Sequence, residues 1–279
     1  MTAPVSVVVP TLDEELNLPE CLRSLAWADE VFVVDSFSGD RTLEIARKHG
    51  AHVVQHAFES YSRQKNWALD NLPLRNEWVL IVDADERVTP GLQCEIESVL
   101  GGSRCDGYYV NRRFIFLGHW IRHAGWYPSW NLRLFRHRLG RYDDRDVHEH
   151  VVLNGTVGYL ISDLLHQDRR GLEAFIARHN RYSTLEAAAR FKAERQSPDR
   201  ARLPLSLLAS PVQRKRFVRE RLWPAVPAKP VALFVYMYVL RRGFLDGRAG
   251  LALSTFHAFQ EFIVGLKLAE LRRLSSPAN

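Results

Sequence analysis

The chain has 279 residues, of which 46% are hydrophobic and 25% charged, with a formal net charge of +6. These values are typical of one large globular domain, or of one domain with an appendage. The three cysteines, at positions 21, 94 and 105, have no paired spacing, which argues against a disulfide framework and a zinc site and favours a reducing compartment. No basic and apolar leader precedes the first strand-like segment, so no export signal is expected.

Most of the positive charge lies late in the chain. Residues 190–221 carry ten Lys or Arg and three acidic residues, so the remainder is close to neutral. A basic cluster of this kind indicates contact with anionic lipid or with nucleic acid. Because the chain contains no recognised nucleic-acid module, we expect an anionic membrane surface and no nucleic acid as its partner.

The first hundred residues alternate between strand and helix patterns. β-branched runs predict strands, and capping and Gly signals predict the helices between them. The expected strands cover residues 5–10, 31–35, 51–56 and 78–82, and the expected helices cover 17–27, 42–49 and 61–70, with another beginning after Thr89-Pro90. This order predicts an α/β protein with a mostly parallel sheet and right-handed crossovers. Neither a Gly-rich dinucleotide fingerprint nor a P-loop is present.

Polar residues follow three of the expected strands, at Thr11 and Asp13, at Asp35, and at Asp83 and Asp85. Because the carboxyl ends of parallel strands meet at one edge of the sheet, these side chains should line one crevice. Alternation along an extended chain would place Asp83 and Asp85 on the same side. Two carboxylates there suit Mg²⁺ or Mn²⁺ carrying a diphosphate. The alternative is a solvated acidic turn.

Four blocks make this interpretation more specific. They are Val-Val-Val-Pro-Thr-Leu-Asp-Glu-Glu (7–15), Val-Asp-Ser-Phe-Ser-Gly-Asp-Arg-Thr (34–42), Arg-Gln-Lys-Asn-Trp-Ala (63–68) and Asp-Ala-Asp-Glu (83–86). In order and spacing they resemble family 2 glycosyltransferases of the GT-A fold. The resemblance implies an α/β, Rossmann-like, mostly parallel sheet and a nucleotide-sugar donor.

The resemblance also implies roles for individual residues. Asp35 would contact the uracil or ribose, whereas Asp40 is expected only to cap the next helix. Asp83 and Asp85 would hold the metal and the donor diphosphate. Arg63 and Lys65 would lie near the diphosphate, with a solvated helix face as the alternative. The residues that would border the nucleotide are Pro10, Thr11, Asp13 and Glu14.

The middle of the chain is rich in aromatic and basic residues. Sugars stack on aromatic rings, so Trp120, Trp126 and Trp130 are candidate sugar contacts, with a small core beside the sheet as the alternative. The apolar and basic alternation at 132–136 predicts a strand.

An acidic loop then leads to His148-Glu149-His150 and to a predicted hairpin over 151–157 with an Asn-Gly turn. An inverting sugar transfer needs a general base for the acceptor hydroxyl, and we predict Glu149, with Asp144 and Asp146 as alternatives. This block, with Gly-Trp-Tyr-Pro (125–128) and Leu-Leu-His (164–166), resembles the lipopolysaccharide-core β-glucosyltransferase branch of the family. Relatives with this fold imply that His166 is a further metal ligand, and a structural histidine is the alternative.

The last third is expected to be helical. Residues 171–195 predict one long helix, while 231–240 and 251–271 are too short or too interrupted by polar residues to span a bilayer. We predict amphipathic helices lying on a membrane, with packing against the catalytic domain as the alternative. The segment Leu-Arg-Arg-Gly-Phe-Leu-Asp-Gly (240–247) also resembles the lipopolysaccharide-core β-glucosyltransferase branch. The predicted domains are a GT-A catalytic domain, 1–168, with nucleotide-sugar (1–100) and acceptor (101–168) halves, and a C-terminal helical, membrane-associating extension, 169–279.

Together these observations predict a metal-dependent, inverting hexosyltransferase. It would move a hexose, with glucose as the favoured sugar, from a UDP-sugar to a membrane glycolipid, with the lipopolysaccharide inner core as the expected acceptor. It would be cytoplasmic and peripheral on the cytoplasmic face of the bacterial inner membrane. One alternative is transfer to a polyprenyl phosphate, which needs no base. Another is a non-catalytic membrane or nucleic-acid binding protein on a transferase scaffold.

Overall fold

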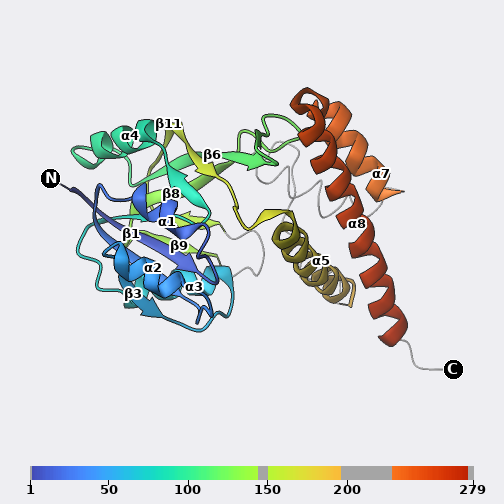
Figure 1. Cartoon of the computed structure of the whole chain (residues 1–279), viewed down its shortest axis with the longest axis horizontal. Coiled ribbons are helices and arrows are strands. Elements are labelled where there is room, and N and C mark those ends of the chain that lie inside the picture. The colour runs from blue at the N-terminus through green and yellow to red at the C-terminus, as the bar shows by residue number, and fades with distance from the viewer. Residues whose placement is uncertain (1, 144–149, 196–227, 276–279) are drawn as a thin grey trace. The chain divides into compact units, whose positions relative to one another are not determined.

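A computed structural model describes residues 2–143, 150–195 and 228–275. The chain forms two compact units, one from residues up to 122 and 126–170, the other from 123–125 and from 171 onward. The expected domain boundary was placed between 168 and 169. Figure 1 labels helices and strands of both units where there is room.

The first unit contains a mixed sheet with helices packed against it. Its helices are α1 (Leu18–Arg23), α2 (Thr42–Lys48), α3 (Tyr61–Asn71) and α4 (Pro90–Leu100). Its strands are β1 (Ala3–Thr11), β2 (Ala28–Asp35), β3 (His52–Gln55), β4 (Trp78–Ile81), β5 (Glu86–Val88), β6 (Gly107–Phe116), β7 (His119–Trp120), β8 (Trp130–Arg136), β9 (Gly140–Tyr142), β10 (Val151–Leu153) and β11 (Val157–His166).

The order of the main sheet is β3-β2-β1-β4-β8-β6-β11-β5, with β7 paired to β6. Strands β3, β2, β1 and β4 are parallel to one another, and so are β6 and β11. Strand β8 runs antiparallel to β4 and β6, and β5 runs antiparallel to β11. The predicted α/β, mostly parallel sheet is therefore confirmed.

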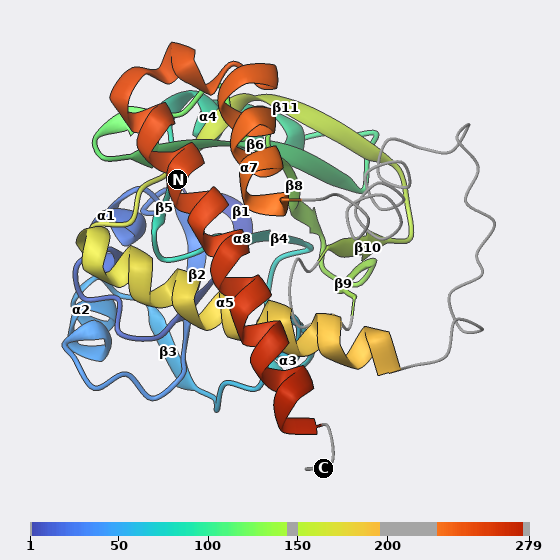
Figure 2. The same cartoon turned by 90° about the vertical axis from the view of Figure 1, so that its right-hand side faces the viewer.

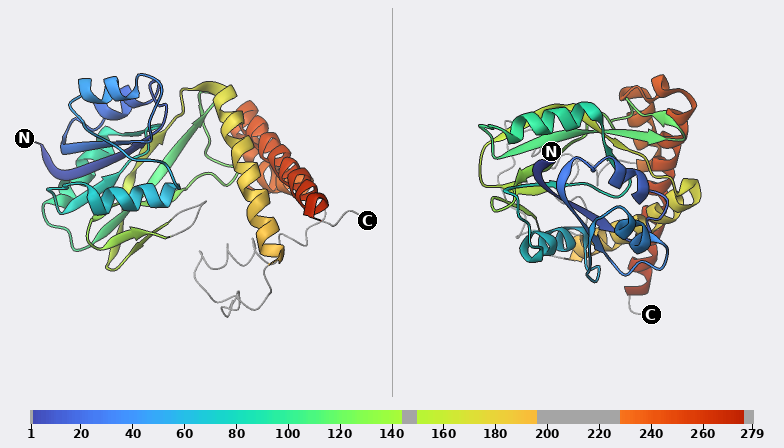
Figure 3. Two further views of the ribbon diagram at one scale, coloured as in Figure 1. Left: turned by 90° about the horizontal axis from the view of Figure 1, so that it is seen from below. Right: turned by 60° about the vertical axis from the view of Figure 1, so that its left-hand side comes forward.

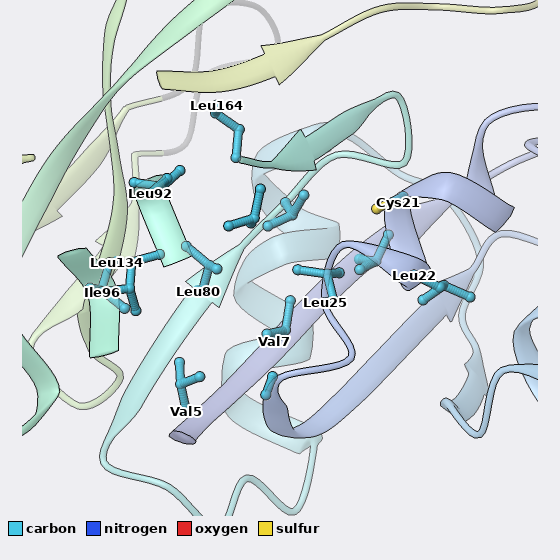
Figure 4. Packing of buried hydrophobic residues seen from close by; sticks show 14 of the residues in the cluster. Val5, Val7, Cys21, Leu22, Leu25, Leu80, Leu92, Ile96, Leu134 and Leu164 are labelled. Atoms are coloured by element: carbon cyan, nitrogen blue, oxygen red, sulfur yellow. The ribbon is translucent and has the colours of Figure 1, made fainter. Parts of the chain in front are cut away.

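Both faces of β1 and β4 are largely buried, which explains their continuous apolar runs. In β1, Val7 packs in one core with Leu22 of α1 and Leu92 of α4, and Figure 4 shows this packing. The next residue, Val8, points to the other face and packs with Leu69 of α3. Because successive side chains alternate, one strand contributes to two cores.

Two of the predicted helix-end residues are confirmed, and a third prediction is wrong. Thr89 caps α4 by accepting from the Leu92 amide at 3.3 Å, and Gly50 follows α2 with a positive φ of 75°. Asn17, predicted to cap the first helix, makes no side-chain cap bond. Its side chain instead joins Glu14 and Asp168, which are far apart in the sequence.

The predicted hairpin over 151–157 is wrong. Strand β10 pairs with β9 in a separate two-stranded sheet, while β11 joins the main sheet parallel to β6. Asp106 explains the difference, because its carboxylate accepts from both the amide and the hydroxyl of Thr156, at 2.8 and 2.9 Å. These bonds hold the start of β11 against the start of β6 and away from β10.

The second unit is helical. It contains α5 (Gly171–Arg195), α7 (Lys229–Phe234), the π-helical turn η4 (Val235–Leu240), the short 3-10 helix η5 (Gly243–Asp246) and α8 (Gly247–Ser275). Helices α5 and α8 run side by side, and α7 lies against α8 (Figures 2 and 3). Arg190 of α5 pairs with both carboxylate oxygens of Glu261 of α8, at 2.7 and 3.0 Å. Within the described residues, no helix combines the length and apolar character needed to cross a bilayer.

Candidate active site

The two aspartates that follow β4 lie in a tight turn. The Glu86 amide donates to the Asp83 carbonyl at 2.8 Å, and the Asp83 amide donates to the Glu86 carboxylate at 2.9 Å. The chain is therefore not extended here, contrary to the prediction from alternation. As a result, Asp83 and Asp85 have different neighbours.

Asp83 lies between two buried cations. Its Oδ1 is 3.3 Å from the Lys65 ammonium of α3, and its Oδ2 accepts from Arg133 Nη2 of β8 at 2.9 Å. The side chains of Lys65 and Arg133 are only 5% and 7% exposed. Burial opposes ionisation of Asp83, but the charges of Arg133 and Lys65 outweigh it and hold its pKa well below the ordinary value. Asp83 is thus a carboxylate throughout the physiological range.

Glu86 is completely buried and shares the same arginine. Arg133 Nη2 donates to Glu86 Oε1 at 2.7 Å, so one guanidinium nitrogen bridges Glu86 and Asp83. Arg112 of β6 approaches the same oxygen at 3.8 Å. Burial raises the pKa of Glu86, and the charge of Asp83 adds to this effect, while Arg133 opposes it. The bridge fixes the turn that carries both aspartates.

Asp85 lies against His166, the last residue of β11. The antiparallel pairing of β5 and β11 places His166 opposite Glu86, and the Gln167 amide donates to the Asp85 carbonyl at 2.9 Å. Asp85 Oδ2 is consequently 3.2 Å from His166 Nε2. Asp85 and His166, which lie 81 positions apart in the sequence, thus meet near the carboxyl end of β4.

The Asp85 and His166 pair has the chemistry of a partial metal site. Two ligands at about 2.1 Å from an octahedral cation lie about 3 Å apart, which agrees with the 3.2 Å between their donor atoms. Within the described residues, however, no three His, Cys, Asp or Glu side chains form a metal cluster. Asp83, the third predicted ligand, contacts Lys65 with its Oδ1 and Arg133 with its Oδ2. Since Mg²⁺ and Mn²⁺ sites complete their coordination with water and phosphate, two protein ligands fit such an ion.

Asp35 organises the loops near the first two strands. It is fully buried and accepts from the Thr11 hydroxyl at 3.1 Å, the Ser38 amide at 2.9 Å and Gln55 Nε2 at 3.3 Å, as well as from the Ser38 hydroxyl. Thr11 is also buried. The structure therefore shows both residues supporting the loops, and the predicted contact of Asp35 with uracil or ribose stays a prediction.

Asp13 is exposed and joins the same loops. It has a positive φ of 52°, its amide donates to the Ser38 hydroxyl at 2.9 Å, and its carboxylate accepts from the Gly39 amide at 2.8 Å. Pro10 is half-buried and lies beside Val34 of β2. These loops lie at the carboxyl ends of β1 and β2, where a nucleotide was expected.

Glu14 connects this region electrostatically to Asp85. Its carboxylate pairs with Arg170 at 2.9 Å and accepts from Asn17 at 2.8 Å. Burial raises the pKa of Glu14 to about 7, Arg170 opposes this shift, and the charge of Asp85 adds to it. Glu14 therefore titrates near neutral pH.

The two basic residues of α3 have different surroundings. Lys65 is buried against Asp83, with its ammonium 5.2 Å from the centre of the Tyr142 ring. Arg63 is 59% exposed and pairs with Glu59 one turn away, at 2.9 Å. Asp40 accepts from the Thr42 amide at 2.9 Å, but the residue at the N-cap position of α2 is Arg41. The structure thus brings Lys65, and not Arg63, to the acidic turn.

One of the three candidate tryptophans lies near the histidine. Trp126 stacks on Phe114 with ring centres 4.6 Å apart, and the Phe114 ring is 5.2 Å from that of His166. The guanidinium groups of Arg113 and Arg122 lie 4.3 and 4.1 Å from the centre of the Trp120 ring, and Trp130 packs edge-on against Tyr159. Trp126 is half-buried, so it retains exposed surface for a ligand.

The predicted base, Glu149, and its alternatives Asp144 and Asp146 lie outside the described residues. Two residues of the site were missed by the sequence analysis, Arg133 and the buried Glu86. No local signal existed for Arg133, because an arginine between two leucines on a strand is also the pattern of a side chain that faces solvent. The partner could not be identified, because it depends on the register of β8 against β4.

The mixed sheet and the acidic turn at the end of its central parallel strand define an α/β protein of the GT-A class. The profile of Glycosyl transferase family 2 matches residues 6–154. The chain belongs to this family, and it is a glycosyltransferase.

Two relatives extend the match. The chain is 32% identical over 192 residues to the lipopolysaccharide core biosynthesis glycosyltransferase LpsC of Rhizobium meliloti, which covers 66% of this chain and 70% of LpsC. It is 27% identical to a glycosyltransferase of Rickettsia bellii, over all of this chain and 90% of the relative. Among solved structures, Staphylococcus aureus TarS 1-349 in complex with UDP-GlcNAc matches 95% of this chain and 92% of TarS, at 17% identity and a TM-score of 0.45. That TM-score is too low to inform the site.

Proposed function

We propose that the protein transfers a hexose, with glucose as the preferred candidate, from a UDP-sugar to a hydroxyl of a membrane glycolipid. The lipopolysaccharide inner core is the proposed acceptor, and the similarity to LpsC supports it. The observation that carries the proposal is the contact of Asp85 with His166 beside the paired Asp83. A carboxylate and an imidazole at this separation suit a divalent cation that holds a diphosphate.

The proposed cofactor is Mg²⁺ or Mn²⁺, held by Asp85 and His166. When bound, the ion would supply positive charge to the departing diphosphate. Lys65 and Arg133 keep Asp83 ionised and fix its position, and the loops around Asp13 and Asp35 would receive the nucleoside.

The transfer itself would be a single displacement. The acceptor oxygen forms a bond to the anomeric carbon, the bond from that carbon to the β-phosphate oxygen breaks, and UDP leaves. Glu149 is the proposed base that removes the proton of the acceptor hydroxyl. Trp126 would stack against a sugar ring.

We further propose that the protein acts on the cytoplasmic face of the bacterial inner membrane, as a peripheral protein. A lipid-linked acceptor would require this location, and the basic late segment of the chain supports it.

The experiment that tests the proposal measures UDP release from UDP-glucose in Mn²⁺ or Mg²⁺, with and without crude lipopolysaccharide acceptor. Asp85→Asn, which keeps the shape and removes the charge, should lose most of this activity. Asp70→Asn is the matched control, since Asp70 is 53% exposed and pairs with Arg141 away from the turn. Absence of UDP release with every UDP-sugar tested would refute the proposed donor class.

A further inference from the structure

A short stretch of the helical unit exposes many large apolar side chains. They come from α7, η4, η5 and the first turn of α8, and their exposed fractions range from 41% to 68%. We call this set the 231–251 surface, and its members are Val231, Val235, Tyr236, Val239, Leu240, Phe244, Leu245 and Leu251. Single exposed apolar residues are ordinary, but eight within 21 consecutive residues mark an interaction site.

The charged residues of this stretch are almost all positive. Between residues 228 and 260 the only acidic residue is Asp246, and it is buried. Its carboxylate accepts from the amide and the imidazole of His123, both at 2.8 Å. The basic residues are Lys229, Arg241, Arg242 and Arg248, and the last three are exposed. The 231–251 surface therefore combines apolar side chains with three exposed arginines.

The backbone that carries this surface is tightly packed, so its apolar residues are not exposed through loose folding. A Cβ on Gly243 would lie 2.9 Å from the Met237 carbonyl oxygen, and one on Gly250 would lie 2.0 Å from the Gly243 carbonyl oxygen. Met237 points inward and is buried. The Ala124 amide also donates to the Arg241 carbonyl at 2.9 Å. These contacts hold the inner side and leave the apolar residues outside.

In the rest of the helical unit, basic residues are accompanied by acidic or polar residues. Where α5 meets α8, cations are paired with acidic or polar partners, as in Arg190 with Glu261 and in Lys267, whose ammonium lies 2.7–2.9 Å from four oxygens of α5. Exposed apolar residues also occur there, such as Ile176 and Leu266, but they stand among acidic residues as well as basic ones. Helices α5 and α8 therefore do not show the same combination.

We propose that the 231–251 surface binds an anionic phospholipid bilayer. Interfacial segments bury their apolar side chains at the boundary between headgroups and acyl chains, while Lys and Arg contact anionic headgroups. The proposal rests on the proposed function, because it names the part of the chain that would hold the enzyme beside a membrane glycolipid. It assigns this role to described residues, whereas most of the basic cluster at 190–221, from residue 196 onward, lies outside them.

The test is co-sedimentation of the full chain with phosphatidylglycerol-containing vesicles and with pure phosphatidylcholine vesicles, without donor or glycolipid. Wild type should bind the anionic vesicles, and less so as salt is raised. Leu240→Glu with Phe244→Glu should weaken binding at least tenfold. Arg242→Gln with Arg248→Gln should weaken it by about fivefold for each lost charge. Ile176→Glu with Leu266→Glu is the matched control and should bind as wild type does.

Three outcomes would overturn the proposal. Wild type could fail to sediment with anionic vesicles, the control could lose as much binding as the Leu240 variant, or neither double variant could change binding. A concentration-dependent dimer that the Leu240 variant dissociates, without vesicle binding, would identify a second copy as the occupant. Circular dichroism checks that each variant is folded. Because these vesicles contain neither donor nor acceptor, the result is independent of the UDP-release assay for the proposed function.

Discussion

Arg133 provides the sharpest test of how the site is held together. Its side chain is 7% exposed, and one of its nitrogens bridges Asp83 and the fully buried Glu86. Arg133→Met keeps an apolar stem of similar length but leaves the Glu86 carboxylate with the Asp83 amide and with Arg112 at 3.8 Å. Removing one partner of a buried ion pair costs about 3–5 kcal/mol, because the other charge stays buried without compensation.

The assay is urea unfolding at pH 7.5, and Arg141→Met is the matched control. Arg141 pairs with Asp70, but these side chains are 44% and 53% exposed, so the control should cost about 0–1 kcal/mol. Adding Glu86→Gln to Arg133→Met should restore part of the loss, because the uncompensated charge is then gone. The reasoning is refuted if Arg133→Met costs no more than Arg141→Met.

Three further predictions concern other parts of the molecule. Because burial raises the folded pKa of Glu14 from 4.5 to about 7, the folded state keeps this proton to higher pH than the unfolded chain, so stability should fall as pH rises from about 4.5 to 7. Glu14→Gln should remove that component, worth up to about 3 kcal/mol, and urea titrations at several pH values measure it. Glu149→Gln should lower kcat/KM with a hydroxyl acceptor about 10²–10⁴-fold if Glu149 is the base, whereas unchanged transfer would favour a polyprenyl phosphate. Gly243→Ala should lower stability by about 1–3 kcal/mol, since its Cβ would meet the Met237 carbonyl, and thermal unfolding would show it.

The parallel half of the fold could be predicted because its signals are local. Runs such as Val5–Val9 and 78–82 are apolar on both faces, and Gly50 and Thr89 mark helix ends through their own backbone and side-chain chemistry. The hairpin predicted over 151–157 was wrong because a non-local contact decides the structure there. An Asn-Gly pair between apolar runs favours a hairpin, but the bonds from Thr156 to Asp106 direct β11 to β6 instead.

The same distinction applies to the site. Asp83 and Asp85 could be found because they follow a strand directly. Arg133 reaches Asp83 only through the pairing of β8 with β4, and no local pattern reports that register. Asp35 has the position expected of a nucleotide contact, yet it is buried, and its four hydrogen bonds come from Thr11 at the end of β1, Gln55 at the end of β3 and Ser38 in the loop after β2.

We propose that Asp85 and His166 hold a divalent cation together with the donor diphosphate. Calorimetric titration of UDP into the protein, with and without Mn²⁺, tests it most directly. We expect UDP to bind wild type much more tightly with Mn²⁺, and Asp85→Asn to lose most of that difference while Asp70→Asn keeps it. Equal UDP affinity with and without Mn²⁺ in wild type, or an unchanged Mn²⁺ effect in Asp85→Asn, would contradict the account.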